Sequence, residues 1–281
     1  MTVNSVNECV KLNSGVKIPQ LGLGVLQAEN GEETKNTVIW ALEAGYRSVD
    51  TASAYGNEHS VGEAMRESGL KREEIFITTK VWNTDQGYEN TLRAFDKSLN
   101  LLGLDYIDMY LIHFAVPGKY LDTWRAMEKL VKGGYVRTIG VCNFHKPHLD
   151  NLLSHAEITP AVNQIEFHPY FTQKELLKYN AEHGIHTEAW SPLGRGASFN
   201  EKIVTDLAKK YNKTPAQIVL RWEVQLGVII IPKSVHKERI IENAQIFDFE
   251  LTKEEICAID SLGRSNRMGV IDPDNISPEW L

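Results

Sequence analysis

Short apolar runs rich in β-branched residues alternate along the chain with longer segments whose apolar residues recur at helical spacing. Runs of this length bounded by polar turns are typical of buried strands, and the intervening segments are typical of helices packed on a sheet. This alternation predicts repeated βα units on a parallel sheet. The eight runs that carry the pattern span residues 21–25, 47–50, 74–80, 107–113, 138–143, 161–167, 185–190 and 227–233.

Turn and cap signals separate the runs. Residues 9–19, CVKLNSGVKIP, place two short strands around an Asn-Ser-Gly turn, which predicts an opening β-hairpin. Helix starts are marked by a capping Thr followed three residues later by Glu or Gln, or by Pro at the first helical position. Such signals occur at Thr172 with Glu175, at Thr214 with Pro215 and Gln217, and at Thr252 with Glu255.

Eight βα units predict an α/β protein in which residues 1–281 form a single (β/α)8 TIM barrel domain, with the hairpin at the N-terminus and a short C-terminal tail. A doubly wound dinucleotide-binding sheet is the alternative, because GLGVLQ at residues 22–27 begins like its glycine motif. The third glycine is absent, and no acidic residue ends a second strand at the required distance. We therefore favour the barrel.

Composition places the chain among globular proteins, with 42% hydrophobic and 24% charged residues. The net charge of -7 without a basic run argues against a nucleic-acid or membrane partner. Cys9, Cys142 and Cys257 are far apart and lack metal-ligand spacing, so we expect free thiols in a reducing compartment. The N-terminus has no apolar signal segment, and we expect a cytoplasmic, monomeric protein.

Polar side chains end most of the predicted strands. In a barrel these positions meet over one mouth, where the chemistry of such folds lies. A lone acid after a strand is more often a turn former or a helix cap. Here, however, several strands each deliver one such group to the same face, and Tyr55 lies in the loop after the second strand. The strand-end groups are Asp50, Lys80, His113, Asn143, Glu166 with His168, Trp190 and Lys233.

Asp50, Lys80 and His113 end adjacent strands, so they should surround the phenol of Tyr55. A phenol has a pKa near 10, and a nearby ammonium lowers it, while a carboxylate keeps that ammonium charged and in place. This arrangement predicts that Tyr55 protonates a developing alkoxide while His113 holds the carbonyl oxygen. Neither a good nucleophile nor a metal site is evident. The pattern therefore indicates reduction of a carbonyl by an external hydride.

Four motifs in order resemble the aldo-keto reductases over essentially the whole chain. They are GYRSVDTASAYGNE with Asp50 and Tyr55, ITTKVWN with Lys80, YLIHF with His113, and IPKSVHKERIIEN near the C-terminus. The resemblance implies an (α/β)8 barrel that binds NADPH across the strand ends and reduces aldehydes and ketones to alcohols. By the same match, Tyr55 is the proton donor and Lys80, Asp50 and His113 are its catalytic partners.

The resemblance also implies how NADPH is held. Asn143 and Gln164 would hydrogen-bond the nicotinamide amide, Trp190 would stack on its ring, and residues 191–194 would line the pyrophosphate. A Lys and an Arg within seven residues, with a Ser between them, also form a compact phosphate clamp on chemical grounds. The full implied set is Gly24, Val25, Asp50, Asn143, Gln164, Trp190, Ser191, Leu193, Gly194, Lys233, Ser234, Val235, Arg239 and Asn243.

Three departures from the family pattern concern the substrate and the nicotinamide. Leu26 and Phe114 replace aromatic residues that often wall the pocket, and Cys142 replaces a Ser before Asn143. Trp82 keeps its place beside the lysine as a pocket wall. With the short loops after His113 and after the last helix, these changes predict an open pocket of broad specificity.

The sequence looks most like the small microbial branch, which contains glyoxal and diketogluconate reductases and the protozoal prostaglandin F synthases. We expect an NADPH-dependent reductase of small aldehydes, ketones and α-dicarbonyls, with a small-molecule carbonyl substrate as its partner. A specialised prostaglandin F synthase or diketogluconate reductase is one alternative, and a non-catalytic NADPH-binding barrel is another. A barrel hydrolase using Asp50 or Glu166 would need a paired carboxylate or a metal, and the sequence supports neither.

Overall fold

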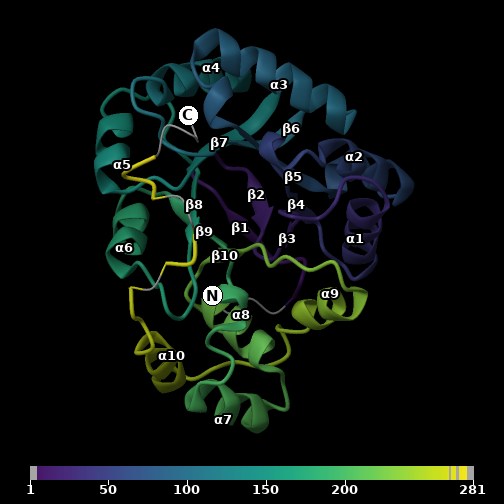
Figure 1. The fold of residues 1–281 in the computed structure, drawn as a ribbon, viewed down its shortest axis with the longest axis vertical. Helices are drawn as coiled ribbons and strands as arrows, with labels where there is room; N and C mark the ends of the chain where they lie inside the picture. The colour runs from purple at the N-terminus through teal and green to yellow at the C-terminus, as the bar shows by residue number, and fades with distance from the viewer. Residues whose placement is uncertain (1–4, 266, 270–271, 277–281) are drawn as a thin grey trace.

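Eight parallel strands form the centre of the molecule, and helices surround them (Figure 1). The computed structural model describes residues 5–265, 267–269 and 272–276. Neighbours in the sheet follow chain order from β3 to β10, as repeated βα units require. The barrel strands are β3 (Leu23–Gly24), β4 (Ser48–Asp50), β5 (Phe76–Val81), β6 (Ile107–Ile112), β7 (Val136–Cys142), β8 (Val162–Glu166), β9 (His186–Trp190) and β10 (Ile229–Ile230).

The sheet closes on itself between its first and last strands. Isolated parallel bridges join Leu21 to Ile230 and Gly24 to Lys233. The amide of Gly22 donates to the carbonyl of Ile230 at 2.8 Å, and that of Gly24 to Pro232 at 3.2 Å. The predicted (β/α)8 barrel is therefore confirmed, although its two closing strands are shorter than the apolar runs that predicted them.

Helices cover the outside of the barrel, and α7 packs mainly on α8 rather than on the strands. Two helices, α7 and α8, follow β9, and α10 comes after the last βα unit (Figure 1). The helices are α1 (Glu32–Glu43), α2 (Glu58–Glu67), α3 (Tyr88–Leu102), α4 (Tyr120–Lys132), α5 (Lys146–Leu153), α6 (Lys174–Glu182), α7 (Lys202–Tyr211), α8 (Pro215–Gln225), α9 (Lys237–Ala244) and α10 (Lys253–Asp260). Short 3-10 turns are η1 (Ser53–Tyr55), η2 (Arg72–Glu74), η3 (Asn83–Asp85) and η4 (Gly194–Gly196).

Two apolar cores lie on opposite sides of the sheet because successive strand residues point to opposite faces. The larger core lies between strands and helices. The smaller fills the barrel interior with Phe76, Met109, Val162 and Ile229. Polar strand residues above this inner core, Asp50 and Lys80 among them, are consequently buried toward the mouth.

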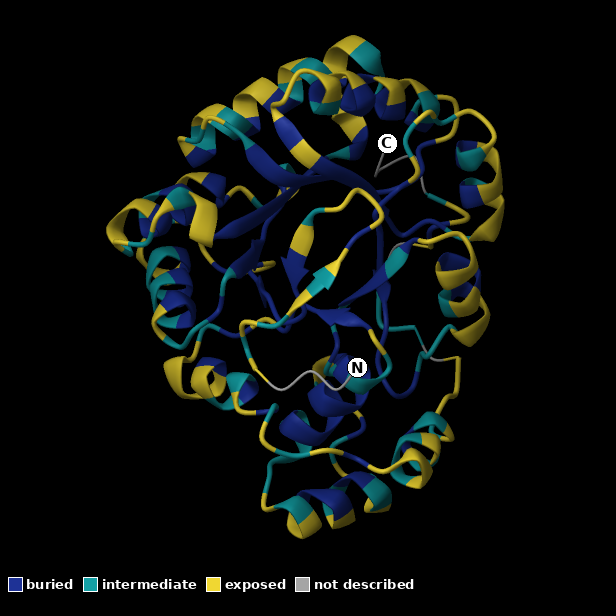
Figure 2. Ribbon diagram, turned by 180° about the vertical axis from the view of Figure 1, so that it is seen from behind, coloured by how far each residue is buried: buried dark blue, intermediate teal, exposed yellow. Residues whose placement is uncertain are grey.

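The predicted hairpin is formed by β1 (Cys9–Lys11) and β2 (Lys17–Pro19), which pair antiparallel. Gly15 in its turn has φ 84°, a conformation that favours glycine. Leu12 and Ile18 join the inner core, so the hairpin closes the barrel floor, the end facing the viewer in Figure 2. The mouth is consequently left as the open end.

Two of the three predicted helix caps are present. Thr214 accepts from the amide of Gln217, and Thr252 from that of Glu255, each in a capping box. The third prediction, at Thr172 with Glu175, was wrong. Helix α6 follows Gln173, which has φ 40° and donates its side-chain amide to the Glu166 carbonyl at 2.5 Å. That tertiary hydrogen bond moves the helix start past the predicted cap.

After α10 the chain returns across the mouth, past β8 and β9 toward α5 (Figure 1). The amide of Gly269 donates to Glu166 at 3.1 Å, and Asp274 contacts the His145 ring at 2.7 Å. The expected short C-terminal tail is thus seen in part, with residues 266, 270–271 and 277–281 outside the described chain. In the part of the chain that is described, no helix has the length and apolar character of a membrane span.

Candidate active site

The predicted strand-end groups meet at the barrel mouth around Lys80. The Lys80 ammonium donates to Asp50 Oδ1 at 2.5 Å, to the Thr51 carbonyl at 2.9 Å and to the Tyr55 hydroxyl at 3.4 Å. Lys80 is fully buried and Asp50 is 2% exposed, whereas Tyr55 is half-buried. One ammonium therefore links a carboxylate below it to a phenol above it.

Local structure after β4 explains how two residues so close in sequence reach the same ammonium. Asp50 ends the strand with its side chain inside the barrel, and η1 then turns the chain so that Tyr55 comes back over the mouth. Ser53 Oγ donates to the Lys80 carbonyl at 2.9 Å, which ties this turn to β5. Asn57 accepts from Thr51 Oγ1 at 2.8 Å and donates to the Val25 carbonyl at 2.9 Å. The turn is therefore held on both sides.

Burial outweighs the ammonium in setting the acidity of Tyr55. It raises the pKa of Tyr55 to about 12, against the opposing effect of Lys80. The predicted lowering of this pKa was therefore wrong, because burial costs the phenolate more hydration energy than the Lys80 charge returns. The phenol nevertheless carries its proton throughout the physiological pH range, which a proton donor requires.

The buried ion pair below Tyr55 keeps its ammonium charged. Burial alone would lower the pKa of Lys80, but the charges of Asp50 and Tyr55 and the Asp50 hydrogen bond raise it. Burial raises the pKa of Asp50, with Lys80 and Gln164 acting in the opposite direction. A buried charge without such a partner would be strongly unfavourable. Lys80 and Asp50 are consequently positioned as one unit.

His113 follows β6 and lies between aromatic rings. Its ring meets the edge of Trp82 with centroids 5.0 Å apart and that of Tyr55 at 5.8 Å, and it stacks on Phe114 at 5.3 Å. Burial, and secondarily the Lys80 charge, hold the pKa of His113 well below its usual value. The imidazole is therefore neutral and can donate one N–H. Its Nδ1 is buried without a hydrogen-bond partner among the described residues.

The residues predicted for the substrate wall surround this histidine on different sides. Trp82 is half-buried and Phe114 is 7% exposed, so both present a fixed apolar surface beside His113. Leu26 is 47% exposed beyond the end of β3, at the rim of the mouth. Trp82 and Phe114 therefore lie where they can form a wall of the substrate pocket, and the pocket stays open on the side of Leu26.

Gly24 and Val25 contribute backbone rather than side chains to this region. A Cβ on Gly24 would lie 2.9 Å from the Ile231 carbonyl oxygen, so glycine is required where β3 and β10 close the barrel. The Val25 side chain is completely buried in the outer core, and its amide donates to the Asp50 carbonyl at 3.1 Å. Any cofactor contact by Val25 is thus limited to main-chain atoms.

The three side chains that were predicted to contact the nicotinamide form hydrogen bonds with one another or with the catalytic residues. Trp190 Nε1 donates to Asn143 Oδ1 at 2.9 Å, and Asn143 Nδ2 donates to the His113 carbonyl at 3.1 Å. Gln164 Nε2 donates to Asp50 Oδ2 at 2.8 Å. Cys142, at the position where the family pattern has Ser, donates its thiol to Gln164 Oε1 at 3.6 Å. This sulfur contact is weak, as predicted from the thiol.

Backbone strain is concentrated in the loops that leave these strands. Asn143 and Ser191, directly after β7 and β9, have φ of 60° and 52°. Such values are uncommon for residues other than glycine and persist where the surroundings impose them. Leu193 and Gly194 follow in the turn of η4, where a Cβ on Gly194 would lie 3.1 Å from the His168 ring. The predicted pyrophosphate segment is therefore a tight, half-buried turn directly after Trp190.

The predicted phosphate clamp surrounds the start of α9, away from the catalytic group. Lys233 and Arg239 are exposed, while Ser234 is 7% exposed and accepts from the His236 amide at 3.1 Å. Within the described parts of the chain, the side chains of Lys233 and Arg239 have neither an ion pair nor a hydrogen bond. Two uncompensated cations at a helix start fit a phosphate monoester. Val235 is half-buried beside this clamp, and Asn243 is 4% exposed one turn beyond it on α9.

Glu188 is a functional candidate that strand ends did not reveal. It lies inside β9, two residues before Trp190, and accepts from Gln164 Nε2 at 2.8 Å. Burial raises the pKa of Glu188 to about 8, with the Asp50 charge acting in the same direction. Strand alternation could have indicated this residue, since residues 186, 188 and 190 share one face of the strand. An acid on the interior face needs a hydrogen-bond partner, but only the pairing register of β8 and β9 identifies that partner as Gln164.

Glu166 and His168, also predicted near a strand end, have structural partners. Glu166 accepts from the His168 ring at 3.1 Å and from the backbone amides of Met268 and Gly269. The carboxylate therefore fastens the C-terminal tail above Trp190, with which a Cβ on Gly269 would collide at 2.8 Å. The described residues contain no cluster of three or more His, Cys, Asp or Glu side chains suited to a metal ion.

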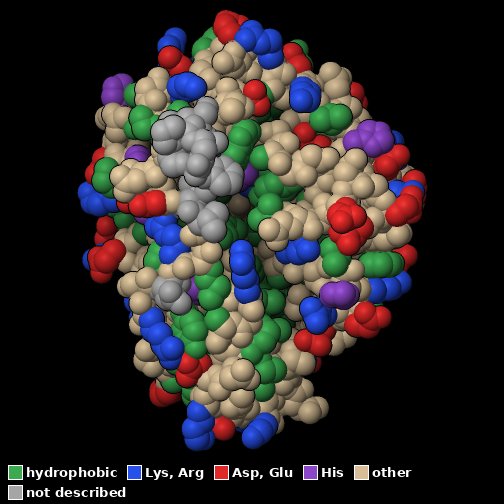
Figure 3. Space-filling model, in the orientation of Figure 1, with side chains coloured by type: hydrophobic (Ala, Val, Ile, Leu, Met, Phe, Trp, Pro, Cys, Tyr) green, Lys and Arg blue, Asp and Glu red, His purple; other side chains and the backbone are tan. Residues whose placement is uncertain are grey.

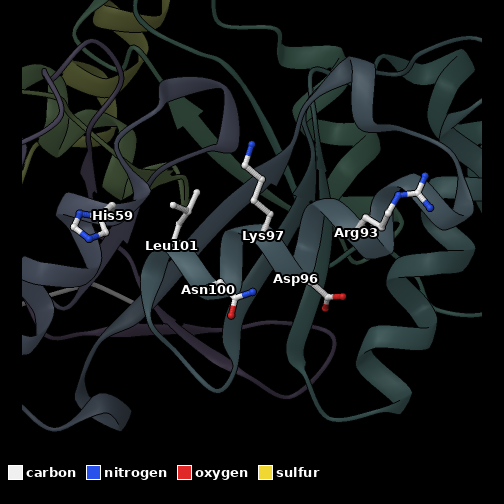
Figure 4. Close-up of a pocket in the computed structure, with 6 residues that line it drawn as sticks. All are labelled: His59, Arg93, Asp96, Lys97, Asn100 and Leu101. Atoms are coloured by element: carbon white, nitrogen blue, oxygen red, sulfur yellow. The ribbon is translucent and has the colours of Figure 1, made fainter.

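Figure 3 shows the surface over the barrel mouth, where hydrophobic side chains gather around a central hollow and continue as a furrow toward the lower edge. A second hollow lies on the outside of the molecule between α2 and α3 (Figure 4). Its lining comes from helix surfaces rather than strand ends, so it is separate from the catalytic group. The lining residues are His59, Arg93, Asp96, Lys97, Asn100 and Leu101.

Comparisons with known proteins agree with this geometry. The family model described as "Aldo/keto reductase family" matches residues 20–264. Glyoxal reductase of Bacillus subtilis (strain 168) is 54% identical over 272 residues, covering 97% of this chain and 98% of the relative. The 9,11-endoperoxide prostaglandin H2 reductase of Trypanosoma cruzi (strain CL Brener) is 51% identical over 279 residues, with 98% of each chain covered. The crystal structure of a Bombyx mori aldo-keto reductase with NADP has a TM-score of 0.90 and 37% identity, covering 100% of both chains.

Proposed function

The chain belongs to the aldo/keto reductase family, and on this premise we propose that it reduces small aldehydes, ketones and α-dicarbonyls to alcohols with Tyr55 as the proton donor. It is an oxidoreductase that uses NADPH to reduce carbonyl groups. The observation that supports the catalytic assignment is the contact of the buried Lys80 ammonium with both Asp50 and the Tyr55 hydroxyl, at 2.5 and 3.4 Å.

The charge and hydrogen-bonding capacity of the predicted residues fit NADPH. Lys233, Ser234 and Arg239 would hold the 2′-phosphate, with Val235 and Asn243 next to the adenosine. The pyrophosphate would lie against Ser191, Leu193 and Gly194. The nicotinamide would be positioned by Trp190, Asn143 and Gln164. Gly24 and Val25 would contact the cofactor with backbone atoms. When bound there, the cofactor supplies the hydride.

The chain's own groups then handle the oxygen of the substrate. Neutral His113 donates a hydrogen bond to the carbonyl oxygen, and Tyr55 gives that oxygen its proton as charge develops on it. Lys80 stabilises the resulting phenolate because its ammonium remains charged through Asp50. Trp82, Phe114 and His113 limit the space beside the reacting carbon, and Leu26 leaves the outer side of the pocket open.

Small α-dicarbonyls are the substrates we propose, since glyoxal reductase is among the relatives and the Leu26 side of the pocket is exposed. Reduction of a prostaglandin endoperoxide is a second candidate, favoured by the trypanosomal relative at 51% identity. The proposal also takes residues 1–281 as one domain of a monomeric, cytoplasmic enzyme without nucleic-acid or membrane partners. Three free thiols and the net charge of -7 support this part.

Loss of NADPH absorbance with methylglyoxal, an aromatic aldehyde and a prostaglandin endoperoxide tests the proposal in the wild-type protein and in Tyr55→Phe. We expect methylglyoxal turnover in the wild type and a loss of at least about 100-fold in Tyr55→Phe, since the variant lacks the general acid. NADPH binding should be retained in the variant. A protein that binds NADPH but reduces no carbonyl would support the non-catalytic alternative instead.

A further inference from the structure

The side-chain amide of Gln164 has both of its hydrogens committed inside the barrel. Its Nε2 donates to Asp50 Oδ2 and to Glu188 Oε2, at 2.8 Å each. An amide nitrogen carries two hydrogens, so these two carboxyl groups use its whole donor capacity. The Gln164 oxygen is therefore the only part of the amide left to meet a ligand.

Strand register brings the two carboxyl groups to the same amide from opposite sides. Gln164 and Glu188 are paired residues of β8 and β9, and both point into the barrel. Asp50 reaches the amide from β4, across the interior. Gln164 and Glu188 are each 1% exposed, so water does not compete for these bonds. A flipped amide would place its oxygen against the Asp50 carboxylate, and also against that of Glu188 once Glu188 is ionised, which is unfavourable.

We propose that Glu188 is a positioning residue for the nicotinamide: together with Asp50 it fixes the orientation of the Gln164 amide, so that Gln164 acts only as an acceptor. The inference rests on the proposed function, in which Gln164 meets the nicotinamide carboxamide. An acceptor at this place pairs with the NH2 of the carboxamide rather than with its oxygen. Glu188 thereby selects how the carboxamide is turned.

The Gln164 oxygen has capacity for such a partner. Its contact with a donor in the described chain is the thiol of Cys142 at 3.6 Å, which is a weak donor. Asn143 Oδ1, by contrast, accepts the indole N–H of Trp190 at 2.9 Å. The carboxamide NH2 thus finds in Gln164 an oxygen with a lone pair available.

The test compares binding of NADPH with binding of its 3-acetylpyridine analogue, in which a methyl group replaces the carboxamide NH2. Dissociation constants are measured by calorimetric titration of the protein, without turnover. The wild type should prefer NADPH about tenfold or more, because the analogue leaves the Gln164 oxygen unpaired. In Glu188→Met, of similar size but with no carboxyl acceptor, only Asp50 remains to orient the amide, and the preference should fall below about threefold. Glu188→Gln, which can still accept, should keep most of it.

Several outcomes would overturn the inference. If Glu188→Met keeps the full preference, or weakens both ligands by the same factor, Glu188 does not orient the amide. Should Glu188→Met fail to fold, the wild type supplies the second measurement. The preference should increase as pH rises through about 8, where Glu188 becomes a carboxylate and a stronger acceptor. Asp50 faces the same amide and burial raises its pKa as well, whereas Tyr55, Lys80 and Cys142 titrate well above this pH. A flat ratio counts against the inference.

Failure of the proposed function would look different. A wild-type protein that binds neither NADPH nor the analogue contradicts the cofactor assignment itself. A wild-type protein that binds NADPH and reduces methylglyoxal, but whose preference is unchanged in Glu188→Met, contradicts only the role of Glu188.

Discussion

Lys80 is a charged residue with no exposed surface, which is unusual unless its charge is compensated. Asp50 supplies the opposite charge at 2.5 Å and the Thr51 carbonyl a further acceptor at 2.9 Å. The third contact, with the Tyr55 hydroxyl, is long at 3.4 Å and contributes less to the folded state. This contact places the ammonium where it can stabilise the Tyr55 phenolate. The same ammonium therefore stabilises the fold through Asp50 and supports catalysis through Tyr55.

Lys80→Met separates these two contributions. Without the ammonium, the Tyr55 phenolate is unsupported and the Asp50 carboxylate is buried without its partner. We expect methylglyoxal turnover to fall by at least about 100-fold. The free energy of unfolding should fall by about 3–5 kcal/mol, the usual effect of breaking a buried ion pair. Steady-state kinetics and chemical denaturation measure the two effects.

The double variant Asp50→Asn with Lys80→Met is the matched control. It removes the uncompensated carboxylate as well, so it should recover much of the lost stability and none of the turnover. Unchanged turnover in Lys80→Met would refute the role of Lys80 in supporting Tyr55.

At the scale of elements, the start of α9 forms a separate anion site. Helix α9 has its N-terminus toward the barrel rim, and its preceding turn is tied by the Ser234 hydroxyl at 3.1 Å from the His236 amide. Unpaired helix amides and two exposed cations make this end positive. Lys237 in the first turn of the helix is directed elsewhere, toward Glu43 of α1 at 3.2 Å. The clamp therefore depends on Lys233 and Arg239.

Arg239→Ala should weaken NADPH binding by about 10- to 100-fold, because a charge-assisted contact with the 2′-phosphate is lost. NADH lacks that phosphate, so its dissociation constant should hardly change. Titration of both cofactors measures the difference. Lys237→Ala removes a cation from the same helix but from an exposed ion pair, and should affect both cofactors little. Equal losses for NADPH and NADH in Arg239→Ala would contradict the clamp.

For the whole molecule, Glu223 of α8 couples stability to pH. Its side chain is completely buried, and neither carboxyl oxygen has a hydrogen-bond partner among the described residues. Burial raises the pKa of Glu223 well above its usual value. The folded protein therefore keeps a proton that the unfolded chain releases near pH 4.5. Stability from this group is fully present below that pH and decreases as pH rises toward the folded pKa.

Glu223→Gln removes this titration while nearly preserving shape. The melting temperature of the variant, minus that of the wild type, should become more positive from pH 5 to pH 8, because only the wild type then tends to release its buried proton. The slope approaches about 1.4 kcal/mol per pH unit in free energy of unfolding. Scanning calorimetry across this range measures it, with Glu238→Gln on the exposed face of α9 as the control. A difference that does not vary with pH would contradict the buried acid.

Much of the site could be read from where apolar runs end. Asp50, Lys80, His113 and Trp190 were all predicted as strand-end groups and all lie at the mouth. The role of Glu188 could not be predicted in this way, because Glu188 lies within its strand and its partner Gln164 belongs to another strand. The raised pKa of Tyr55 could not be predicted either, because burial of the phenol depends on the packed structure rather than on its neighbours in sequence.

The sequence by itself determined the local structure: which segments are strands or helices, where two capping boxes lie, and which polar groups leave the strand ends. These follow from periodicity and cap chemistry, which act between residues close along the chain. Only the tertiary structure decided that β3 meets β10, that Gln164 lies between Asp50 and Glu188, and that Glu166 fastens the tail. The physical reason is that strand register and barrel closure fix the distances between residues far apart in sequence. Burial then sets how strongly the charges on those residues interact.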